Sequence, residues 1–239
     1  MKNIFLKKKI LILIPARGGS TSIKDKNIIK LNNRPLIYYS YLASKLLREK
    51  SKIITCTSDS KKIIKICERF GLKNNILRPK KYSTKHALDI TFVNHALKYF
   101  SSKKILFKYG LILRPTSPIR SKKTINKAYQ KFSKSNFSSM RAIVESPITP
   151  YKIWRKKGSS ITPLIKLKKK EPYNMPRQKL PLTFWQTGNF EFFRINFNRK
   201  LNSISGKKIM GYEISKDQSL DIDNKEDLLN IDKKIKKYF

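Results

Sequence analysis

The sequence has few acidic residues, few cysteines and few histidines, and it has no long apolar run. Asp and Glu number 15 among 239 residues, against 55 Lys and Arg, and there are 2 cysteines and 2 histidines. Cys56 and Cys67 form no CxxC pattern and no cluster with histidine, which argues against a structural zinc site and favours buried, reduced thiols. The apolar run Ile10–Ile14 is about half the length of a secretory signal core, and no stretch approaches the ~20 apolar residues of a membrane span. We therefore expect a cytoplasmic protein with no membrane partner.

The scarcity of acidic residues leaves a formal net charge of +40. A field of this sign would attract nucleic acid, anionic membranes or phosphorylated small molecules. The lysines are spread along the whole chain beside many Ile and Asn residues, however, and compositional bias produces the same pattern. One hypothesis is a basic nucleic-acid-binding α/β protein. Because charge alone determines neither fold nor activity, we expect no nucleic-acid partner.

Residues 1–145 alternate between strand patterns and helix patterns. The continuous apolar run Ile10–Ile14 is typical of a strand covered on both faces, and Pro35 opens a helix-patterned segment. Further strand and helix patterns follow in turn, which predicts a mostly parallel sheet flanked by helices. Ligands of such sheets bind beyond the carboxyl ends of the strands. The loops that we expect to gather at that edge are Pro15–Asn27, Thr57–Ser60, Arg78–Asp89 and Arg114–Arg120.

The pattern changes between residues 146 and 197. Prolines become frequent, helix periodicity is lost, and the segment LTFWQTGNFEFFRI predicts two strands around a turn at Thr187–Gly188. We interpret residues 146–197 as an irregular arm within a single domain that spans residues 1–239. The final segment, NKEDLLNIDKKIKKYF, predicts a helix with acidic residues at its start and lysines at its end, as the helix dipole favours.

The segment PARGGSTSIKDKN, which follows the first strand pattern, contains neither a Walker A motif nor GxGxxG. Gly18 and Gly19 would allow close approach of the main chain to an anion. Arg17 and Lys26 add positive charge, and Ser20 adds a hydroxyl. Taken alone, the segment is equally a phosphate-binding loop or a plain turn between strand and helix with solvated charges.

Two further patterns suggest ligand binding. Asp221 and Asp223 flank Ile222 in the segment SLDIDNKED, so in extended backbone both carboxylates point the same way, towards one cation. Hard oxygen ligands suit Mg²⁺ that bridges nucleotide phosphates, but an acidic cluster can equally cap a helix, with Asp223 or Asn224 as the cap. Arg177 lies in the proline-framed loop YNMPRQKLP, where it either holds a carboxylate or phosphate or is one more surface charge.

Seven motifs in one order resemble those of the acylneuraminate cytidylyltransferases, or CMP-sialic acid synthetases, a family with wider similarity to the CMP-Kdo synthetases. They run from about Ile10 to Ile235 and so cover nearly the whole chain. IPARGGSTSIKDKNI is similar to the family's IPARGGSKGIPxKNI, NNRPLIYYSY to NGKPLIxxxI and TSDSKKI to STDSxxI. LRPKKYSTKHALDITFVNHAL resembles RPxxLSxDxAxxxDVxxHAL, while LRPTSPIR, PRQKLP and SLDIDNKEDL resemble LQPTSPLR, RRQxLP and SxDIDTxxDL. Each motif alone is weak, but seven in order are specific for the family.

The resemblance implies a Rossmann-like nucleotide-diphospho-sugar transferase fold and a homodimer in which the irregular arm exchanges contacts. It implies transfer of CMP from CTP to the anomeric hydroxyl of sialic acid or another nonulosonic acid, with release of pyrophosphate and assistance by Mg²⁺. Carried over residue by residue, it assigns catalysis at the triphosphate to Arg17 and Lys26, CTP contacts to Arg17, Gly18, Gly19, Ser20, Asn27, Arg78, Ala87 and Asp89, sugar contacts to Arg114, Arg177 and Gln178, and metal binding to Asp221 and Asp223.

The sequence departs from the family pattern at several places. The usual Lys-Gly after the loop serine is Thr21–Ser22, the following proline is Lys24, and the aspartate of LSxD is Lys85. The glutamine of LQPTSP is Arg114, and the tyrosine of the family's Asn-Gly-Ala-Ile-Tyr is Glu191. These departures suggest either a changed sugar, with Arg114 contacting its carboxylate or an altered substituent, or a degenerate member that binds nucleotide without turnover.

Overall fold

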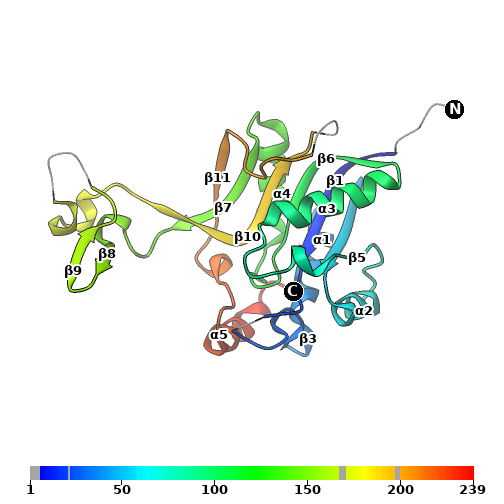
Figure 1. Cartoon of the computed structure of the whole chain (residues 1–239), viewed down its shortest axis with the longest axis horizontal. Coiled ribbons are helices and arrows are strands. Elements are labelled where there is room, and N and C mark those ends of the chain that lie inside the picture. Colours follow the sequence, from blue (N-terminus) through cyan, green and yellow to red (C-terminus); the bar gives the residue numbers. More distant parts are fainter. Residues whose placement is uncertain (1–5, 21, 167–170, 197–199) are drawn as a thin grey trace.

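The computed structural model describes residues 6–20, 22–166, 171–196 and 200–239. Within these residues the core is a seven-stranded sheet with the strand order β11-β7-β10-β6-β1-β4-β5 (Figure 1). β10 is antiparallel to both of its neighbours, and the other neighbouring pairs are parallel. The strands are β1 (Leu6–Pro15), β4 (Lys52–Ser58), β5 (Ile76–Leu77), β6 (Ile105–Ile112), β7 (Ser139–Glu145), β10 (Phe184–Arg194) and β11 (Ile209–Glu213). The expected mostly parallel sheet is confirmed.

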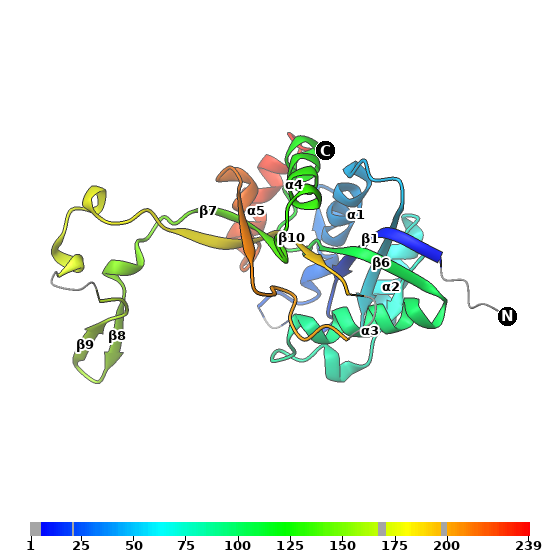
Figure 2. The same cartoon turned by 90° about the horizontal axis from the view of Figure 1, so that it is seen from above.

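Helices cover both faces of this sheet (Figure 2). They are α1 (Leu36–Leu46), α2 (Lys61–Arg69), α3 (Asp89–Ser102), α4 (Lys122–Lys134) and α5 (Lys225–Ile235). Ile10 and Ile12 of β1 pack in one cluster with α1 and α4, while Leu11 and Leu13 pack in another with α3. All four side chains are fully buried, because successive side chains of a strand point to opposite faces and both faces are covered. This arrangement explains the continuous apolar run in the sequence.

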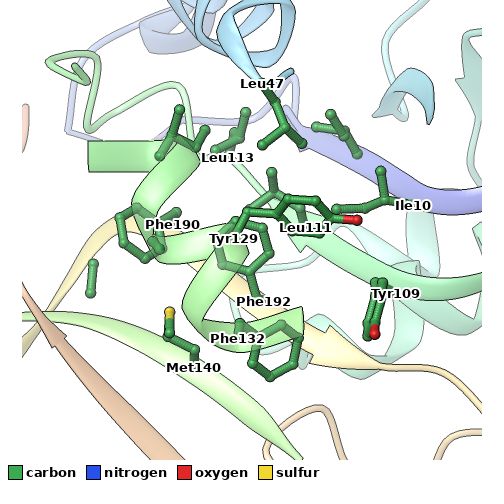
Figure 3. Close-up of a cluster of buried hydrophobic side chains, with 14 of the residues drawn as sticks. Ile10, Leu47, Tyr109, Leu111, Leu113, Tyr129, Phe132, Met140, Phe190 and Phe192 are labelled. Atoms are coloured by element: carbon green, nitrogen blue, oxygen red, sulfur yellow. The ribbon is translucent and has the colours of Figure 1, made fainter. Parts of the chain in front are cut away.

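The larger core cluster holds β10 against its neighbours (Figure 3). Phe192 of β10 packs against Tyr129 and Phe132 of α4, with the Phe132 and Phe192 rings 5.8 Å apart between centroids, and Phe190 packs against Phe192 in the same cluster. Burying each such ring contributes about 1.5–3 kcal/mol. Because side chains alternate along a strand, Glu191 between these two phenylalanines points to the opposite face of the sheet, towards α3.

The predicted arm divides into two parts. The chain leaves the sheet after β7 and forms an extension that stands away from the body in both views, with a small hairpin of β8 (Trp154–Lys157) and β9 (Ser160–Pro163) (Figures 1 and 2). It then returns to the body as β10, which starts at Phe184 and belongs to the main sheet. The arm is therefore shorter than the interval 146–197 that the loss of helical periodicity indicated.

The prediction of two strands around a turn at Thr187–Gly188 is wrong. β10 continues through this point as one strand, with a shift of register between Gln186 and Glu191 where it pairs with β7. Thr187 is buried and its hydroxyl donates to the main-chain carbonyl of Ala142 at 3.3 Å. A Cβ at Gly188 would lie 2.4 Å from Oγ of Ser117. The glycine therefore allows close packing at a bulge and not a chain reversal.

Three other expectations have clear outcomes. The C-terminal helix is confirmed, although α5 ends at Ile235 and not at the last residue. Cys56 and Cys67 are buried and free of any disulfide, as expected. Among the residues that the structure describes, no helix combines the length and the apolar character needed to cross a bilayer.

The topology places a crevice at one edge of the sheet. From β1 the chain proceeds outwards to β4 and β5, and then returns to place β6 on the other side of β1. Chain connections therefore diverge between β1 and β6, and in open α/β sheets ligands bind at the carboxyl ends of the strands next to such a switch point.

Candidate active site

A cavity of about 430 Å³ opens at the carboxyl ends of β1 and β6. Nine of the residues that the sequence predicts for the site line it: Arg17, Ser20, Lys26, Asn27, Arg78, Ala87, Asp89, Arg114 and Asp223. Eight of these residues come from three of the four loops expected at this edge, and Asp223 comes from the acidic segment near the C-terminus. The fourth loop joins them because the main-chain N–H of Gly18 donates to Asp59 Oδ1 at 2.9 Å. The prediction that the loops after the strands gather on one rim is confirmed.

The loop after β1 is held in place by its own polar side chains. Asn27 Nδ2 donates to the carbonyl of Arg17 at 3.0 Å, which ties the two ends of the loop together. A Cβ at Gly18 would lie 3.0 Å from Cβ of Ser60, whereas one at Gly19 would meet nothing within 4 Å. Gly18 therefore serves close packing against the start of α2, and Gly19 leaves the main chain open. Thr21, the position of the missing family lysine, lies outside the described residues.

Lys26 connects this loop to the acidic segment near the C-terminus. Its ammonium group donates to the carbonyl of Ile222 at 2.8 Å and to Asp223 Oδ1 at 3.3 Å. The Lys26 side chain is 10% exposed, whereas that of Asp223 is 82% exposed. A buried ammonium group needs such partners, because leaving it unpaired would be unfavourable. Lys26 therefore joins two walls of the cavity that are 197 positions apart in the sequence.

The acidic segment presents the Asp223 carboxylate to the cavity because Ile222 anchors it, whereas Asp221 is half-buried, accepts from the N–H of Ile222 at 3.0 Å and is not among the residues that line the cavity. The Ile222 side chain is fully buried, and its N–H donates to the carbonyl of Thr116 at 2.9 Å. The residue that caps α5 is Asn224, whose side chain accepts from the N–H of Asp227 in a reciprocal capping box. Of the two caps that the sequence allowed, Asn224 is the one observed, so the Asp223 carboxylate is left to Lys26 and the cavity.

The acidic segment has the donor chemistry that Mg²⁺ requires. Asp221 and Asp223 supply two carboxylates, and within the described ranges no group of three or more His, Cys, Asp or Glu side chains is arranged to hold a metal. Magnesium bound with a nucleotide commonly takes one or two protein carboxylates and fills its other positions with phosphate oxygens and water. The two aspartates fit that pattern but would not form a closed site by themselves.

Arg78 is a buried cation with spare hydrogen-bonding capacity. It is 6% exposed, and its Nε donates to Oγ of Ser83 at 2.7 Å. Its Nη1 atom is buried and, within the described part of the chain, has no hydrogen-bond partner. Burial lowers the pKa of Arg78, while the nearby Asp59 carboxylate opposes that effect. A buried donor without a partner is exceptional in proteins, and an acceptor on a ligand in the adjacent cavity would satisfy it.

Arg114, which also lines the cavity, is saturated with carboxylates. Its Nη2 atom contacts Asp89 Oδ2 and donates to Glu191 Oε1 at 2.5 Å, and its Nε donates to the same Glu191 oxygen at 3.2 Å. The other Glu191 oxygen is paired with Arg141. Burial alone would lower the pKa of Arg114, but the bonds to Asp89 and Glu191 outweigh it and raise the pKa.

Sequence reasoning missed part of this arrangement. Arg141 was not singled out, and Glu191 was noted only as a departure from the family pattern. The available signal was one acidic residue inside the apolar run NFEFF of a chain with only 15 acids. Ser83 was also missed, although it lies in a quoted motif. Lys85 lines the cavity, whereas Lys24 is exposed and does not line it.

Two predicted sugar contacts lie elsewhere in the chain. Arg177 and Gln178 line a separate cavity of about 410 Å³ at the base of the arm. The Arg177 guanidinium donates to the carbonyls of Ser146 at 2.8 Å and Pro147 at 2.9 Å, and it pairs with Glu145 at 3.6 Å. Within one chain it therefore attaches the arm to the segment in which the chain leaves β7, and its role at a sugar stays a prediction.

Comparison with known proteins supports the sequence resemblance. The pseudaminic acid cytidylyltransferase of Campylobacter jejuni subsp. jejuni serotype O:23/36 (strain 81-176) is 33% identical over 140 residues, which are 57% of this chain and 59% of that protein. The match thus spans less than two thirds of that relative's length. The post-translational flagellin modification protein B of Campylobacter coli is 27% identical over 232 residues, which are 92% of each chain.

Solved structures and the family model complete the comparison. A structure described as CMP:2-keto-3-deoxy-manno-octonic acid synthetase complexed with CTP shares the fold, with a TM-score of 0.67 at 13% identity over 96% of this chain and 99% of that chain. The family model described as cytidylyltransferase matches residues 11–228. Since that match covers the strands, the loops and the acidic segment that build the cavity, the chain belongs to the cytidylyltransferase family.

Proposed function

We propose that the protein transfers CMP from CTP to the anomeric hydroxyl of an acidic sugar of the nonulosonic acid class and releases pyrophosphate. The observation that carries the proposal is the convergence of Arg17, Lys26, Arg78 and the Asp223 carboxylate on one cavity at the switch point of the sheet. Family membership supports CTP as the nucleotide, and the name of the Campylobacter jejuni relative supports a nonulosonic acid as the acceptor.

The residues of the cavity suit phosphoryl transfer. In this reaction the sugar hydroxyl attacks the α-phosphate of CTP, and the protein mainly positions the reactants and neutralises negative charge. Arg17, the open main chain at Gly19 and the hydroxyl of Ser20 are the groups that we assign to the triphosphate. Asp221 and Asp223 would hold Mg²⁺, which supplies charge neutralisation at the phosphates when bound.

We propose that the working protein is a homodimer and that the arm is its main contact. Nine large apolar residues of the arm and the start of β10 are at least about one-third exposed: Ile148, Ile153, Trp154, Ile161, Leu164, Ile165, Leu182, Phe184 and Trp185. Exposed apolar side chains concentrated in one segment favour an interaction site there. An exchange of arms between two copies would allow Arg177 and Gln178 to approach the cavity of the partner subunit.

The test is release of pyrophosphate from CTP and Mg²⁺ with a panel of sialic acid, pseudaminic acid and 2-keto-3-deoxy-manno-octonic acid. We expect release with at least one acid and none after chelation of the metal. Asp221→Ala should reduce turnover at least about a hundredfold, since it removes half of the proposed metal ligands. Asp217→Asn is the matched control, because Asp217 lies four positions away and pairs with Lys234 on the surface.

The outcomes separate the proposed function from its alternatives. Thermal stabilisation by CTP without release of pyrophosphate for any sugar would instead indicate a nucleotide-binding member without turnover. No response to CTP, together with salt-sensitive binding to DNA or RNA, would favour the nucleic-acid hypothesis. Near-normal activity of Asp221→Ala would contradict the metal assignment alone.

A further inference from the structure

Four charged side chains form a continuous line from the cavity wall into the sheet. We call them the charge line: Asp89 at the start of α3, Arg114 after β6, Glu191 in β10 and Arg141 in β7. Their side chains are 36%, 29%, 3% and 10% exposed, so the line runs from solvent to interior. Each member contacts the next, because Arg114 pairs with both Asp89 and Glu191, and Glu191 also pairs with Arg141. The roles assigned above to the phosphate side of the cavity do not use this line.

The charges of the line do not balance without its outermost member. Arg114, Glu191 and Arg141 together carry one net positive charge. A charge in such a place is strongly unfavourable unless it is paired, so an anion must stand on the cavity side of Arg114. In the structure, Asp89 fills that position from the first turn of α3, where the helix dipole also favours a carboxylate.

The two carboxylates on Arg114 differ in how readily a ligand could replace them. Glu191 is buried, and its second oxygen is taken by Arg141, whose other terminal nitrogen donates to Oγ of Ser205 at 2.8 Å. Asp89 also contacts Arg114 at two points, through Oδ2 at Nη2 and through Oδ1 at 3.4 Å from Nη1, but it lines the cavity and is one-third exposed. An arriving anion would therefore displace Asp89 and leave the pair with Glu191 intact.

The main chain of Arg114 is fixed as well. Its carbonyl accepts a hydrogen bond at 2.8 Å from the guanidinium of Arg120, which is itself 1% exposed. Arg120 also donates to the carbonyl of Asn189 in β10 at 2.6 Å. Both ends of the Arg114 residue are thus attached to β10, so its guanidinium presents a fixed, planar fork to the cavity.

We propose that Arg114 binds the carboxylate of the acidic sugar by exchanging Asp89 for it, with Glu191 and Arg141 as the residues that position Arg114. This inference rests on the proposed function. In a 2-keto sugar acid the carboxyl carbon is bonded to the anomeric carbon, so a carboxylate on Arg114 holds the attacking hydroxyl at the cavity wall. A sugar without a carboxylate would displace Asp89 from Arg114 without supplying a negative charge to replace it, so the Arg114 guanidinium would lose its outer anion.

The test compares one sugar acid with its carboxamide, using the best acid of the panel. For the native protein we expect kcat/KM for the acid to exceed that for the carboxamide by about 10- to 100-fold, as charge-assisted paired hydrogen bonds give. Arg114→Gln should reduce this ratio to about threefold or less by raising KM for the acid. Arg114→Lys should give an intermediate ratio, because it keeps the charge but not the fork. Thermal stabilisation by CTP shows whether each variant is folded, and Arg48→Gln, an exposed arginine after α1, is the matched control.

The inner and outer members of the line give opposite expectations. Asp89→Asn removes the competing carboxylate, so KM for the acid should fall severalfold relative to KM for the carboxamide. Glu191→Gln removes the support of Arg114, so KM for the acid should rise more than kcat falls, and Glu191→Asp should restore part of the acid preference. A purely structural role would change the amount of folded protein and leave the ratio of acid to carboxamide unaltered.

Each result has one meaning. If the native protein releases pyrophosphate with no acid, the proposed function fails and this inference fails with it. If it turns over the acid but Arg114→Gln keeps the native ratio, or if the native protein accepts acid and carboxamide equally well, only the inference is overturned. A reduced ratio in Arg114→Gln together with an increased ratio in Asp89→Asn supports the exchange.

Discussion

Two of the arginines that line the cavity, the buried Arg78 and the half-buried Arg114, differ in how their charges are compensated. On the wall that contains Arg78, the guanidinium donates a hydrogen bond to the neutral hydroxyl of Ser83 and lies over the ring of Phe92, and one terminal nitrogen is unsatisfied within the described residues. On the wall that contains Arg114, the guanidinium contacts the carboxylates of Asp89 and Glu191. The positive charge of Arg78 is therefore not neutralised by a hydrogen-bonded carboxylate of the protein, whereas the charge of Arg114 is neutralised by two of them.

This difference indicates what each wall can recognise. A cation with neutral partners attracts any anion that fits, which suits a triphosphate that arrives with several charges. A cation with a carboxylate partner binds a ligand only if the ligand replaces that partner, so binding becomes an exchange and selects a ligand with one well-placed carboxylate. We therefore expect variants of the two walls to affect different substrates and, on the second wall, to affect stability as well.

The largest effect should come from the centre of the charge line. Glu191→Leu leaves Arg141 in the interior with a serine hydroxyl as its remaining described partner and removes the inner support of Arg114. Breaking a buried pair in this way destabilises a protein by about 3–5 kcal/mol. Urea unfolding followed by circular dichroism would measure the loss in the free energy of unfolding.

A double variant separates the lost charge pair from lost packing. Replacing both partners of a buried pair by apolar residues is often neutral, so adding Arg141→Met to Glu191→Leu should recover most of the lost stability, while Asp89 still pairs with Arg114. If Glu191→Leu alone lowers the free energy of unfolding by less than about 1 kcal/mol, which is the scale of an exposed ion pair, then Glu191 is not an essential buried counter-ion of Arg114 and Arg141.

The next largest effect should come from Lys26, which lies on the phosphate side of the cavity. Lys26→Met removes both a charge at the phosphate side and the bond to the acidic segment. We expect kcat to fall about 10²–10³-fold, as when one donor is removed from a preorganised site, with a smaller effect on the free energy of unfolding. Initial rates of pyrophosphate release at saturating sugar would measure it. Lys24→Met is the matched control, since Lys24 is exposed and does not line the cavity. An equal loss in Lys24→Met would mean that Lys24 replaces the family lysine missing at Thr21.

The phosphate side of the cavity could be predicted from the sequence, because it depends on short strand patterns and on the polar residues that directly follow them. Apolar runs such as Ile10–Ile14 predict buried strands, and the carboxyl ends of parallel strands necessarily meet at one edge. The polar residues after each strand therefore had to come together, and the structure brings them together around one cavity. The outcome at Asp223 needed the structure, because only the observed cap at Asn224 shows that its carboxylate is not used by α5.

The surroundings of Arg114 could not be predicted from the sequence, because they depend on the pairing register of β10 with β7 and on a bulge in β10. Glu191 stands opposite Arg141 across the β10–β7 pair only after the register shift that follows Gln186. Cross-strand partners interact through such pairing, and a sequence does not contain the pairing. The glycine of this bulge led the sequence analysis to predict a turn at Thr187–Gly188. Gly188 is instead required because a side chain there would collide with Ser117.

The smallest effect should come from Ser83, and it tests whether the two walls act on separate substrates. Ser83→Ala removes the hydroxyl that accepts from Nε of Arg78 and leaves the guanidinium in place. Loss of one such hydrogen bond is worth about 1–1.5 kcal/mol, so KM for CTP should rise roughly five- to tenfold. Rates at varied CTP and saturating sugar would measure it, with Ser101→Ala, an exposed serine near the end of α3, as the control. KM for the sugar acid should stay within about twofold of the native value, because the contacts of Arg114 do not include Ser83. A matching rise in KM for the sugar would show that the walls are coupled, and the contrast between Arg78 and Arg114 would then describe one shared subsite.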